Sequence, residues 1–178
     1  MNLNEELYIR IQHHKLWDES IMLKRNEYLK VSGTVDTNLY YIIAGSLKVF
    51  ISNESEEHII RFGYKNNFIL SLDSFITEKP SEFYIQAIKK TELKIISRSK
   101  YLSFINQDSD NKFLWDKILE QLILQQLERE KDILTTSPKE RFQRVMKRSP
   151  QLFQEIPNKY IASYLRMSPE TLSRLKKS

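Results

Sequence analysis

The most informative pattern of the chain lies in residues 156–178, IPNKYIASYLRMSPETLSRLKKS. Pro157 and Pro169 each stand where a helix is expected to begin, since a proline at that position loses no intrahelical hydrogen bond. Ser168 is the natural N-cap of the second helix. The stretch therefore predicts a short helix, a tight turn and a second short helix.

The two predicted helices have matching apolar faces. Leu172 and Leu175 fall on one face of the second helix at three-residue spacing. Ile161, Ala162 and Leu165 make the facing stripe of the first helix, where a small alanine permits a close crossing. One alternative is a helical hairpin that only completes a small bundle. The other is a helix-turn-helix whose second helix contacts DNA through its polar residues, Glu170, Thr171, Ser173, Arg174 and Lys177.

Basic residues are concentrated in the same part of the chain. The net charge is +5, from 28 Lys or Arg and 23 Asp or Glu, but residues 137–178 hold ten Lys or Arg and three Glu. Cations beside a groove-reading helix increase the affinity for DNA because they release condensed counterions. A basic face that meets only solvent is the alternative, although such surfaces usually intersperse both signs.

This sequence resembles the DNA-binding domain of Crp/Fnr-type bacterial transcription regulators within residues 137–175. The recognition helix of that family carries a Glu-Thr-x-Ser-Arg core, which is present here at positions 170–174. The resemblance implies that Glu170, Ser173 and Arg174 read bases, in line with the pairing of Arg with guanine and of Glu with cytosine. The predicted DNA-binding residues are Ser168, Glu170, Thr171, Ser173, Arg174 and Lys177.

Two positions depart from the family pattern. Arg166 stands in the turn where the family often has glycine. Either Arg166 adopts a left-handed backbone at a cost of about 1 kcal/mol, or the turn has another shape. Pro169 stands where some relatives have an arginine, which removes one guanine contact and should alter the preferred DNA sequence.

A third helix is expected before this pair. Ser137 and Glu140 form a capping box, and Pro138 takes the first helical position. Phe142 and Val145 belong to its buried stripe. Four basic side chains of this helix are expected to face either DNA phosphates or solvent. They are Arg141, Arg144, Lys147 and Arg148.

Residues 111–134 contain no Gly or Pro and many strong helix formers, which predicts one long helix. Its apolar residues cover more than one stripe: Trp115, Ile118, Leu119, Leu122, Ile123, Leu127 and Leu134. One side is expected to meet the N-terminal part of the same chain, and another to meet a second copy. The alternative is a core helix within a single chain. Two-fold pairing would supply a second DNA half-site, which favours the homodimer.

The N-terminal part alternates short runs rich in Val, Ile, Tyr and Phe with turn residues. The runs are residues 27–31, 39–43, 47–51, 58–64, 83–88 and 93–96. This spacing predicts a small barrel or roll, with a hairpin turn at Ala44-Gly45-Ser46. Residues 40–50 are similar to the cyclic-nucleotide-binding β-roll, a double-stranded β-helix, that precedes the DNA-binding domain in Crp/Fnr proteins.

The residues argue against cyclic AMP as the signal. Nucleotide-binding members of the family grip the ribose with a Gly-Glu pair and clamp the phosphate with an Arg followed by Ser or Thr. Neither pair occurs in residues 66–84, so a cyclic phosphate would lack its bidentate partner. A connecting loop with solvated polar groups is one interpretation of this region. The other is a pocket for an unknown effector, formed by Ser71, Asp73, Ser74 and Lys79.

Several classes of site are not expected. The chain has no cysteine, which excludes thiolate-ligated clusters and disulfides. His13 and His14 are adjacent on a predicted helix and point apart, while His58 stands alone, so no metal site is expected. The sequence has no glycine-rich phosphate loop and no nucleophile elbow. We therefore expect no cofactor and no enzymatic activity. A protein-binding adaptor with a degenerate DNA-binding domain is the main alternative, ahead of a β-roll metal enzyme.

Together these features predict an α+β protein with three parts. They are a cNMP-binding-like β-roll sensor domain (1–110), a long connecting and dimerisation helix (111–134) and a (winged) helix-turn-helix DNA-binding domain (135–178). The expected function is that of a homodimeric transcription regulator that reads an inverted repeat in double-stranded DNA. The resemblance implies RNA polymerase as a further partner. No apolar run approaches the roughly 20 residues that cross a bilayer, so no membrane partner and a cytoplasmic location are expected.

Overall fold

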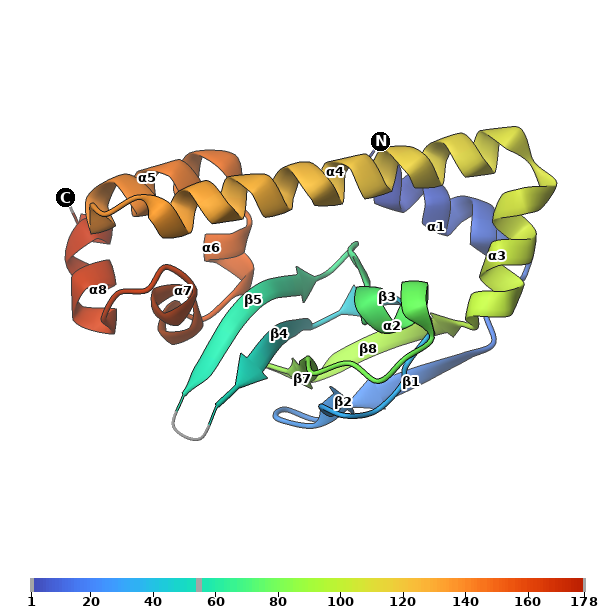
Figure 1. Cartoon of the computed structure of the whole chain (residues 1–178), viewed down its shortest axis with the longest axis horizontal. Coiled ribbons are helices and arrows are strands. Elements are labelled where there is room, and N and C mark those ends of the chain that lie inside the picture. Colours follow the sequence, from blue (N-terminus) through green and yellow to red (C-terminus); the bar gives the residue numbers. More distant parts are fainter. Residues whose placement is uncertain (1, 54–55, 178) are drawn as a thin grey trace.

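The computed structural model describes residues 2–53 and 56–177. Its longest element is helix α4 (Ser109–Leu134), which extends along most of the molecule (Figure 1). Two β-sheets lie on one side of α4, and helices α5 to α8 gather around its carboxyl end. Helix α4 begins two residues before the predicted start and ends at the predicted residue. The early start has a local cause, because the Asp108 side chain caps the helix by accepting a hydrogen bond from the Asp110 amide at 2.8 Å.

The N-terminal part is a β-roll of two four-stranded sheets, as the sequence predicted. All of the strand pairs are antiparallel. The first sheet has the order β1-β8-β3-β6 and consists of β1 (Glu19–Leu23), β8 (Thr91–Ile96), β3 (Leu39–Ala44) and β6 (Phe68–Ile69). The second has the order β2-β7-β4-β5 and consists of β2 (Tyr28–Lys30), β7 (Tyr84–Ala87), β4 (Ser46–Ser52) and β5 (Glu57–Tyr64). Their facing apolar side chains fill the roll, including Ile42, Leu47, Ile85 and Leu93, all with no exposed surface.

The predicted hairpin at Gly45 is wrong. Strands β3 and β4 on either side of it belong to different sheets, so the chain crosses from one sheet to the other there. Gly45 has a φ of +96°, and a Cβ at this position would collide with Thr91. Glycine is therefore needed for the crossing, because it adopts a positive φ at little cost. The same property made a hairpin turn plausible from the sequence. The genuine hairpin joins β4 to β5.

Two strands, β1 and β6, were not predicted from the sequence. Strand β1 is mostly exposed, and it is held at the sheet edge by pairing with β8 rather than by its own apolar alternation. Strand β6 has only two residues and pairs with β3 through Tyr40 and Tyr41. Pairing with distant strands defines both elements, so a local pattern carries little signal for them.

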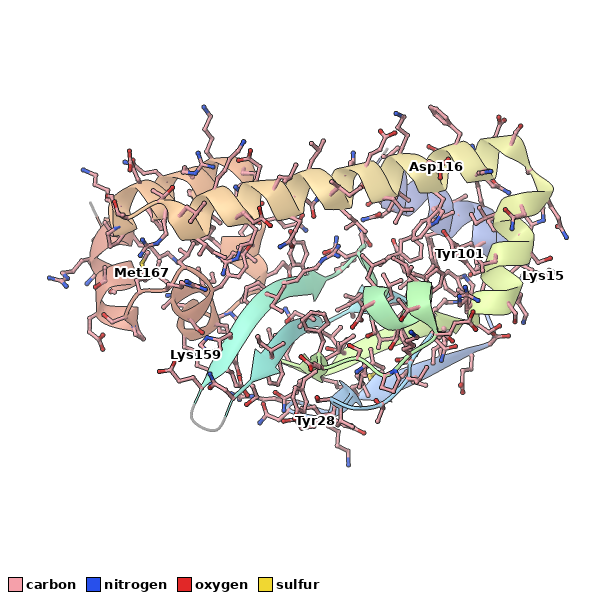
Figure 2. All side chains as sticks on the ribbon, in the orientation of Figure 1. Lys15, Tyr28, Tyr101, Asp116, Lys159 and Met167 are labelled. Atoms are coloured by element: carbon pink, nitrogen blue, oxygen red, sulfur yellow. The ribbon has the colours of Figure 1, made fainter. Side chains whose placement is uncertain are left out.

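A second apolar cluster joins the helices to the roll. It involves α1 (Leu3–His13), α2 (Leu72–Thr77), α3 (Arg98–Gln107) and α4. Leu7 and Ile11 of α1 are fully buried against it. Tyr101 of α3 lies in the interior, and its ring packs edge-on against Trp115 of α4 at 5.1 Å between ring centroids (Figure 2). The amino-terminal half of α4 is therefore anchored on the roll.

The remaining helices form a C-terminal unit, defined here as residues 135–177. Its helices are α5 (Pro138–Arg148), α6 (Leu152–Glu155), α7 (Asn158–Tyr164) and α8 (Pro169–Lys177). The predicted stripes of Phe142, Val145, Ile161 and Leu172 are buried in one cluster. This cluster continues into the roll through Phe50, Ile59, Phe62 and Ile88. The C-terminal unit therefore packs directly on the second sheet.

The wing expected beside these helices is not present up to Lys177. Residues 97–177 contain helices and loops and no strand. Residues 149–156, between α5 and α7, contain the short helix α6 and no β-hairpin, with Leu152 buried against the neighbouring helices. Burial of Leu152 in this helical turn packs the short connection against its neighbours without a strand.

Candidate nucleic-acid interface

The turn between α7 and α8 has a left-handed residue at Arg166. Its φ is 52°, so Arg166 adopts the conformation that glycine would adopt at lower cost. The Arg166 amide donates to the Ser163 carbonyl at 3.0 Å, and the Met167 amide donates to the Ala162 carbonyl at 3.0 Å. These bonds satisfy carbonyls that the end of α7 would leave unpaired. The turn is therefore the regular tight one, and the first of the two alternatives for Arg166 is confirmed.

Ser168 caps helix α8 as predicted. Its hydroxyl accepts a hydrogen bond from the Thr171 amide at 3.2 Å, and its Oγ lies 3.2 Å from the Thr171 Oγ1. Pro169 is the first residue of α8. Leu172 is fully buried and Leu175 is half-buried, so the predicted apolar stripe holds the helix against its neighbours. Helix α7 begins at Asn158, one residue later than predicted, with Pro157 in the capping position.

The polar circumference of α8 is open to solvent. Ser168, Glu170, Ser173, Arg174 and Lys177 are exposed, and Thr171 is half-buried. Hydrogen bonds from its own amide and from Ser168 lower the pKa of the Glu170 carboxyl, and Arg174 one turn on adds to this. The six predicted residues thus lie together on one helix and its cap. Lys176, beside them, instead donates to the Asn158 Oδ1 at 2.9 Å.

The arginines of α5 form hydrogen bonds and ion pairs within the protein, in place of the expected contact with either DNA phosphates or solvent alone. Arg141 is only 8% exposed. Its guanidinium donates to the carbonyls of Leu165 at 2.9 Å and Arg166 at 3.1 Å, in the turn before α8. It also donates to those of Thr135 at 2.6 Å and Thr136 at 2.9 Å, at the end of α4. Arg141 therefore joins the long helix to the turn, because five donors on one planar group can bond several carbonyls at once.

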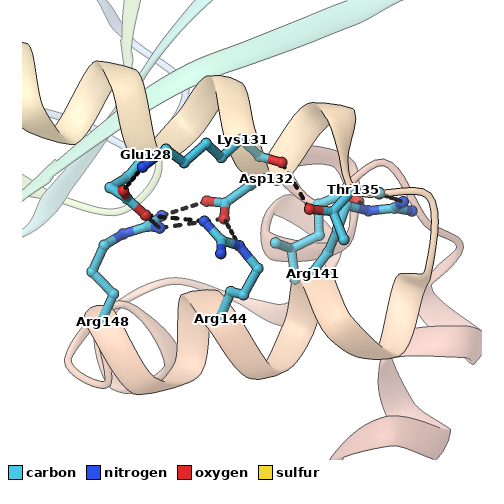
Figure 3. A network of polar contacts seen from close by, with 8 residues as sticks. Glu128, Lys131, Asp132, Thr135, Arg141, Arg144 and Arg148 are labelled. Carbon is cyan, nitrogen blue, oxygen red and sulfur yellow. Dashed lines mark hydrogen bonds and ion pairs between the residues drawn. The ribbon is translucent and has the colours of Figure 1, made fainter.

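Arg144 and Arg148 are also engaged internally (Figure 3). The Arg144 Nε lies 3.0 Å from Asp132 Oδ1, and the Arg148 Nη2 lies 2.5 Å from Asp132 Oδ2. Both arginines also approach Glu128, at 3.0 and 3.7 Å. Asp132 has no exposed surface, so its charge depends on these two partners. Of the four basic residues predicted on α5, only Lys147 is exposed.

Three of the four residues of the predicted effector pocket form local hydrogen bonds or lie beside such bonds, and the fourth is exposed. The Ser71 hydroxyl donates to Asp73 Oδ1 at 2.9 Å, and the Ser74 hydroxyl donates to the Lys79 carbonyl at 2.7 Å. The side chain of Lys79 is exposed. Ser71, Asp73 and Ser74 therefore gather around α2, where their polar atoms bond within the segment. This region is a helix and a turn rather than the loop that the alternative assumed.

Close to this segment lies a buried cation that the sequence pattern missed. Lys30 is 4% exposed, and its ammonium donates to the carbonyls of Val31, Ser81 and Phe83 at 2.8 to 3.1 Å. Burial lowers its pKa, and Asp73 and Asp36 oppose that shift. Lysine in a strand usually faces solvent, so the sequence offered no signal for its burial. Within residues 2–53 and 56–177, no group of three or more His, Cys, Asp or Glu is placed to hold a metal ion.

Comparison with known proteins agrees with this architecture. Residues 21–108 match the family described as the cyclic nucleotide-binding domain. A mutant of CooA from Carboxydothermus hydrogenoformans is similar in structure, with a TM-score of 0.72 at 14% identity over 99% of this chain and 83% of that chain. FixK2 from Bradyrhizobium japonicum has a TM-score of 0.71 at 15% identity, over 89% and 82%. The catabolite activator protein of Thermus thermophilus has a TM-score of 0.58 at 19% identity, over 97% and 81%.

The chain therefore contains a cyclic nucleotide-binding domain and has the fold of the Crp/Fnr regulators. The resemblance drawn from the sequence is confirmed. No curated protein matches the chain by sequence. Across the described residues, no helix combines the length and apolar character needed to span a membrane.

Proposed function

We propose that this protein is a cytoplasmic, sequence-specific DNA-binding transcription regulator of the Crp/Fnr type, with α7 and α8 as its helix-turn-helix. The observation that carries the proposal is the exposed polar face of α8 beside a tight turn and a buried apolar stripe. A recognition helix needs this combination, because it must be held firmly from behind while its front enters the major groove. Glu170, Ser173 and Arg174 are the base-reading residues in this proposal, and Lys177 contacts phosphate.

We also propose that the protein acts as a homodimer through α4. Five large apolar side chains on this helix are at least 48% exposed: Phe113, Ile123, Leu124, Leu127 and Leu134. The residues of α4 that meet the roll lie on another side of the helix, including Leu114, Trp115 and Ile118. A soluble helix that exposes a second apolar stripe is stabilised by a second copy, as in a coiled coil. The dimer would place two α8 helices for the two halves of an inverted repeat, with RNA polymerase as a further partner.

The effector of this regulator is proposed to be something other than cyclic AMP. Strands β6 and β7 and helix α2 carry no arginine, so the segment has no planar fork for a cyclic phosphate. The pocket around Ser71, Asp73, Ser74 and Lys79 remains a prediction. Its hydroxyls are already bonded, so a ligand there would have to replace existing hydrogen bonds.

Selection from random duplex DNA tests the proposed DNA-binding function. Enriched sequences should contain two similar half-sites related by inversion, about 10 base pairs apart or a multiple of this. The affinity for the enriched duplex should fall as salt rises, because phosphate contacts release counterions. If no sequence is enriched and the affinity does not respond to salt, the protein is the adaptor and not a DNA reader.

A charge placed in the α4 stripe tests the homodimer. We expect Leu124→Glu to shift the protein from dimer to monomer in sedimentation velocity, since a carboxylate would be buried without a partner in the dimer. Gln126→Glu, at an exposed polar position of the same helix, is the matched control and should leave the dimer intact. A wild-type protein that sediments as a monomer at all concentrations would contradict the proposed dimer.

A further inference from the structure

A cavity of about 160 Å³ lies where the roll, helix α4 and the C-terminal unit meet. Arg61 and Tyr64 of β5 line it from the roll, Gln125 lines it from α4, and Arg148 and Tyr164 line it from the C-terminal unit. A cavity of roughly 150 Å³ accommodates a molecule the size of benzene. The space is therefore sufficient for a small molecule that touches both parts of the protein.

Arg61 has no acidic partner at this cavity. No hydrogen bond or ion pair engages its guanidinium within the described residues. Burial lowers the pKa of Arg61, and the nearby Tyr164 and Tyr64 oppose this shift. Arg61 is half-buried, and a guanidinium that is partly withdrawn from water normally has a carboxylate or carbonyl partner, because removing a charge from water is costly. Arg61 is thus a donor of five hydrogen bonds with none of them used inside the protein.

A second arginine beside the cavity is also incompletely paired. Arg129 is 6% exposed, and neither its Nε nor its Nη1 has a hydrogen-bond partner. Its Nη2 reaches the Ile59 carbonyl only at 3.5 Å. The guanidinium stacks on the ring of Tyr164, with 3.7 Å from Cζ to the ring centroid. Stacking compensates part of the charge but leaves these two nitrogens without a hydrogen-bond acceptor.

The charges around Tyr164 are unbalanced. Burial raises the pKa of Tyr164. The positive charges of Arg129, Arg148 and Arg61 oppose this shift, and the negative charge of Asp132 adds to it. Asp132 already pairs with Arg144 and Arg148. The other acids nearby are also paired: Glu128 with Lys131, Arg144 and Arg148, and Glu155 with Lys89. At least two positive charges, those of Arg61 and Arg129, therefore have no carboxylate partner at this junction within the described residues.

We propose that the cavity is a binding site for a small anion with several negatively charged oxygens, namely phosphate or a phosphomonoester. Arg61 donates to the anion from the roll. Arg148, which lines the cavity and stays paired with Asp132, and Arg129, which stacks on Tyr164 at the cavity wall, add positive charge. Guanidinium groups bond such oxygens in pairs, and a bidentate contact is among the stronger polar interactions in proteins. The bound anion fastens the C-terminal unit to the roll. This inference concerns binding alone and does not depend on the proposed contact with DNA.

Isothermal titration of the full chain with inorganic phosphate, and separately with glycerol 3-phosphate, tests the site. Glycerol at the same concentration and chloride at the same ionic strength are the reference titrations. At least one of the two anions should bind saturably with one site per chain and raise the thermal midpoint, because a ligand bound only to the folded state stabilises it. The tighter of the two identifies free phosphate or a phosphomonoester as the natural source of the group.

Arg61→Gln should weaken this binding about tenfold or more, since it removes the fork and its charge. Arg25→Gln is the matched control, because Arg25 is exposed in the turn between β1 and β2 and far along the chain from the cavity. Arg61→Lys keeps the charge but not the fork and should bind with intermediate affinity, which provides a test even if Arg61→Gln does not fold.

Three results would overturn the proposal. They are the absence of saturable binding of both anions to the wild-type protein, wild-type affinity in the folded Arg61 variants, and an equal loss of binding in Arg25→Gln. None of these results depends on DNA, so they are separable from the outcome of the duplex selection.

Discussion

The arginines of α5 and the single arginine of α8 belong to the same C-terminal unit and have opposite surroundings. Arg174 on α8 is exposed, whereas Arg141 on α5 is buried among backbone carbonyls. Arg144 and Arg148 are bonded to Asp132 and Glu128 of α4. A charge count over residues 137–178 therefore overstates the number of cations available to DNA. The arginines of α5 position the C-terminal unit, and Arg174 of α8 is left exposed to meet a partner.

The largest expected effect is at the buried carboxylate that pairs with α5. We expect Asp132→Ala to lower the free energy of unfolding by about 3–5 kcal/mol, because Arg144 and Arg148 lose the partner that compensates their charge. Urea denaturation measures this change. Glu130→Ala, at an exposed position of the same helix, is the control and should change stability by less than about 0.5 kcal/mol. Equal effects of the two substitutions would show that the Asp132 network does not hold the C-terminal unit.

Arg141→Met should have the next largest effect. The substitution keeps the apolar stem but leaves four carbonyls without their donor, at a cost of about 1.5–3 kcal/mol in the free energy of unfolding. Two of these carbonyls flank the turn before α8, so DNA binding should weaken as well. Thermal and urea unfolding measure the change, with the exposed Lys139→Met as the control. If Arg141→Met has the same free energy of unfolding as the wild-type protein, Arg141 does not stabilise the turn.

Arg174→Ala should affect DNA recognition and leave stability unchanged. We expect it to cost about 1–3 kcal/mol of binding free energy on the preferred duplex and to relax the preference at one base pair. Fluorescence anisotropy on the preferred duplex and on duplexes changed at single positions measures both effects. Equal losses on preferred and random DNA would contradict the role of Arg174 in reading a base.

Lys177→Ala should have the smallest effect. Its loss should weaken binding to all sequences alike and reduce the slope of log affinity against log salt by about 1, as expected for one phosphate contact. The measurement is the affinity for preferred and random duplexes over a range of salt concentrations. A loss confined to the preferred duplex would move Lys177 from phosphate contact to base reading.

Local signals in the sequence carried much of the fold. The caps at Ser137 and Ser168 are where the pattern predicted them, with hydrogen bonds to the amides of Glu140 and Thr171. The long helix differs from its prediction by two residues at one end. Caps and helical periodicity depend on residues within one or two turns, so they are legible without tertiary structure.

The candidate site was only partly predictable for a physical reason. The sequence marked Glu170 and Arg174 because their residue types and spacing match a recognition helix. The same reasoning failed for Arg141, since a basic residue on an amphipathic helix carries no sign of whether it faces solvent or a distant carbonyl. It also failed at Gly45, because a left-handed glycine serves a hairpin and a crossing between sheets equally well.

Residue type and short-range periodicity were enough to predict the long helix, helices α5, α7 and α8, the caps at Ser137 and Ser168, most of the strands and the polar face of α8. Helices α2, α3 and α6 were not predicted, and which charges are free depends on the tertiary structure. No local sequence pattern identifies Asp132 as the ion-pair partner of Arg144 and Arg148. Arg61 and Arg129, in contrast, lie near Tyr164 at the junction of roll and helices without a carboxylate partner. A charge has its effect through what lies within a few ångströms of it, and long-range packing sets those neighbours.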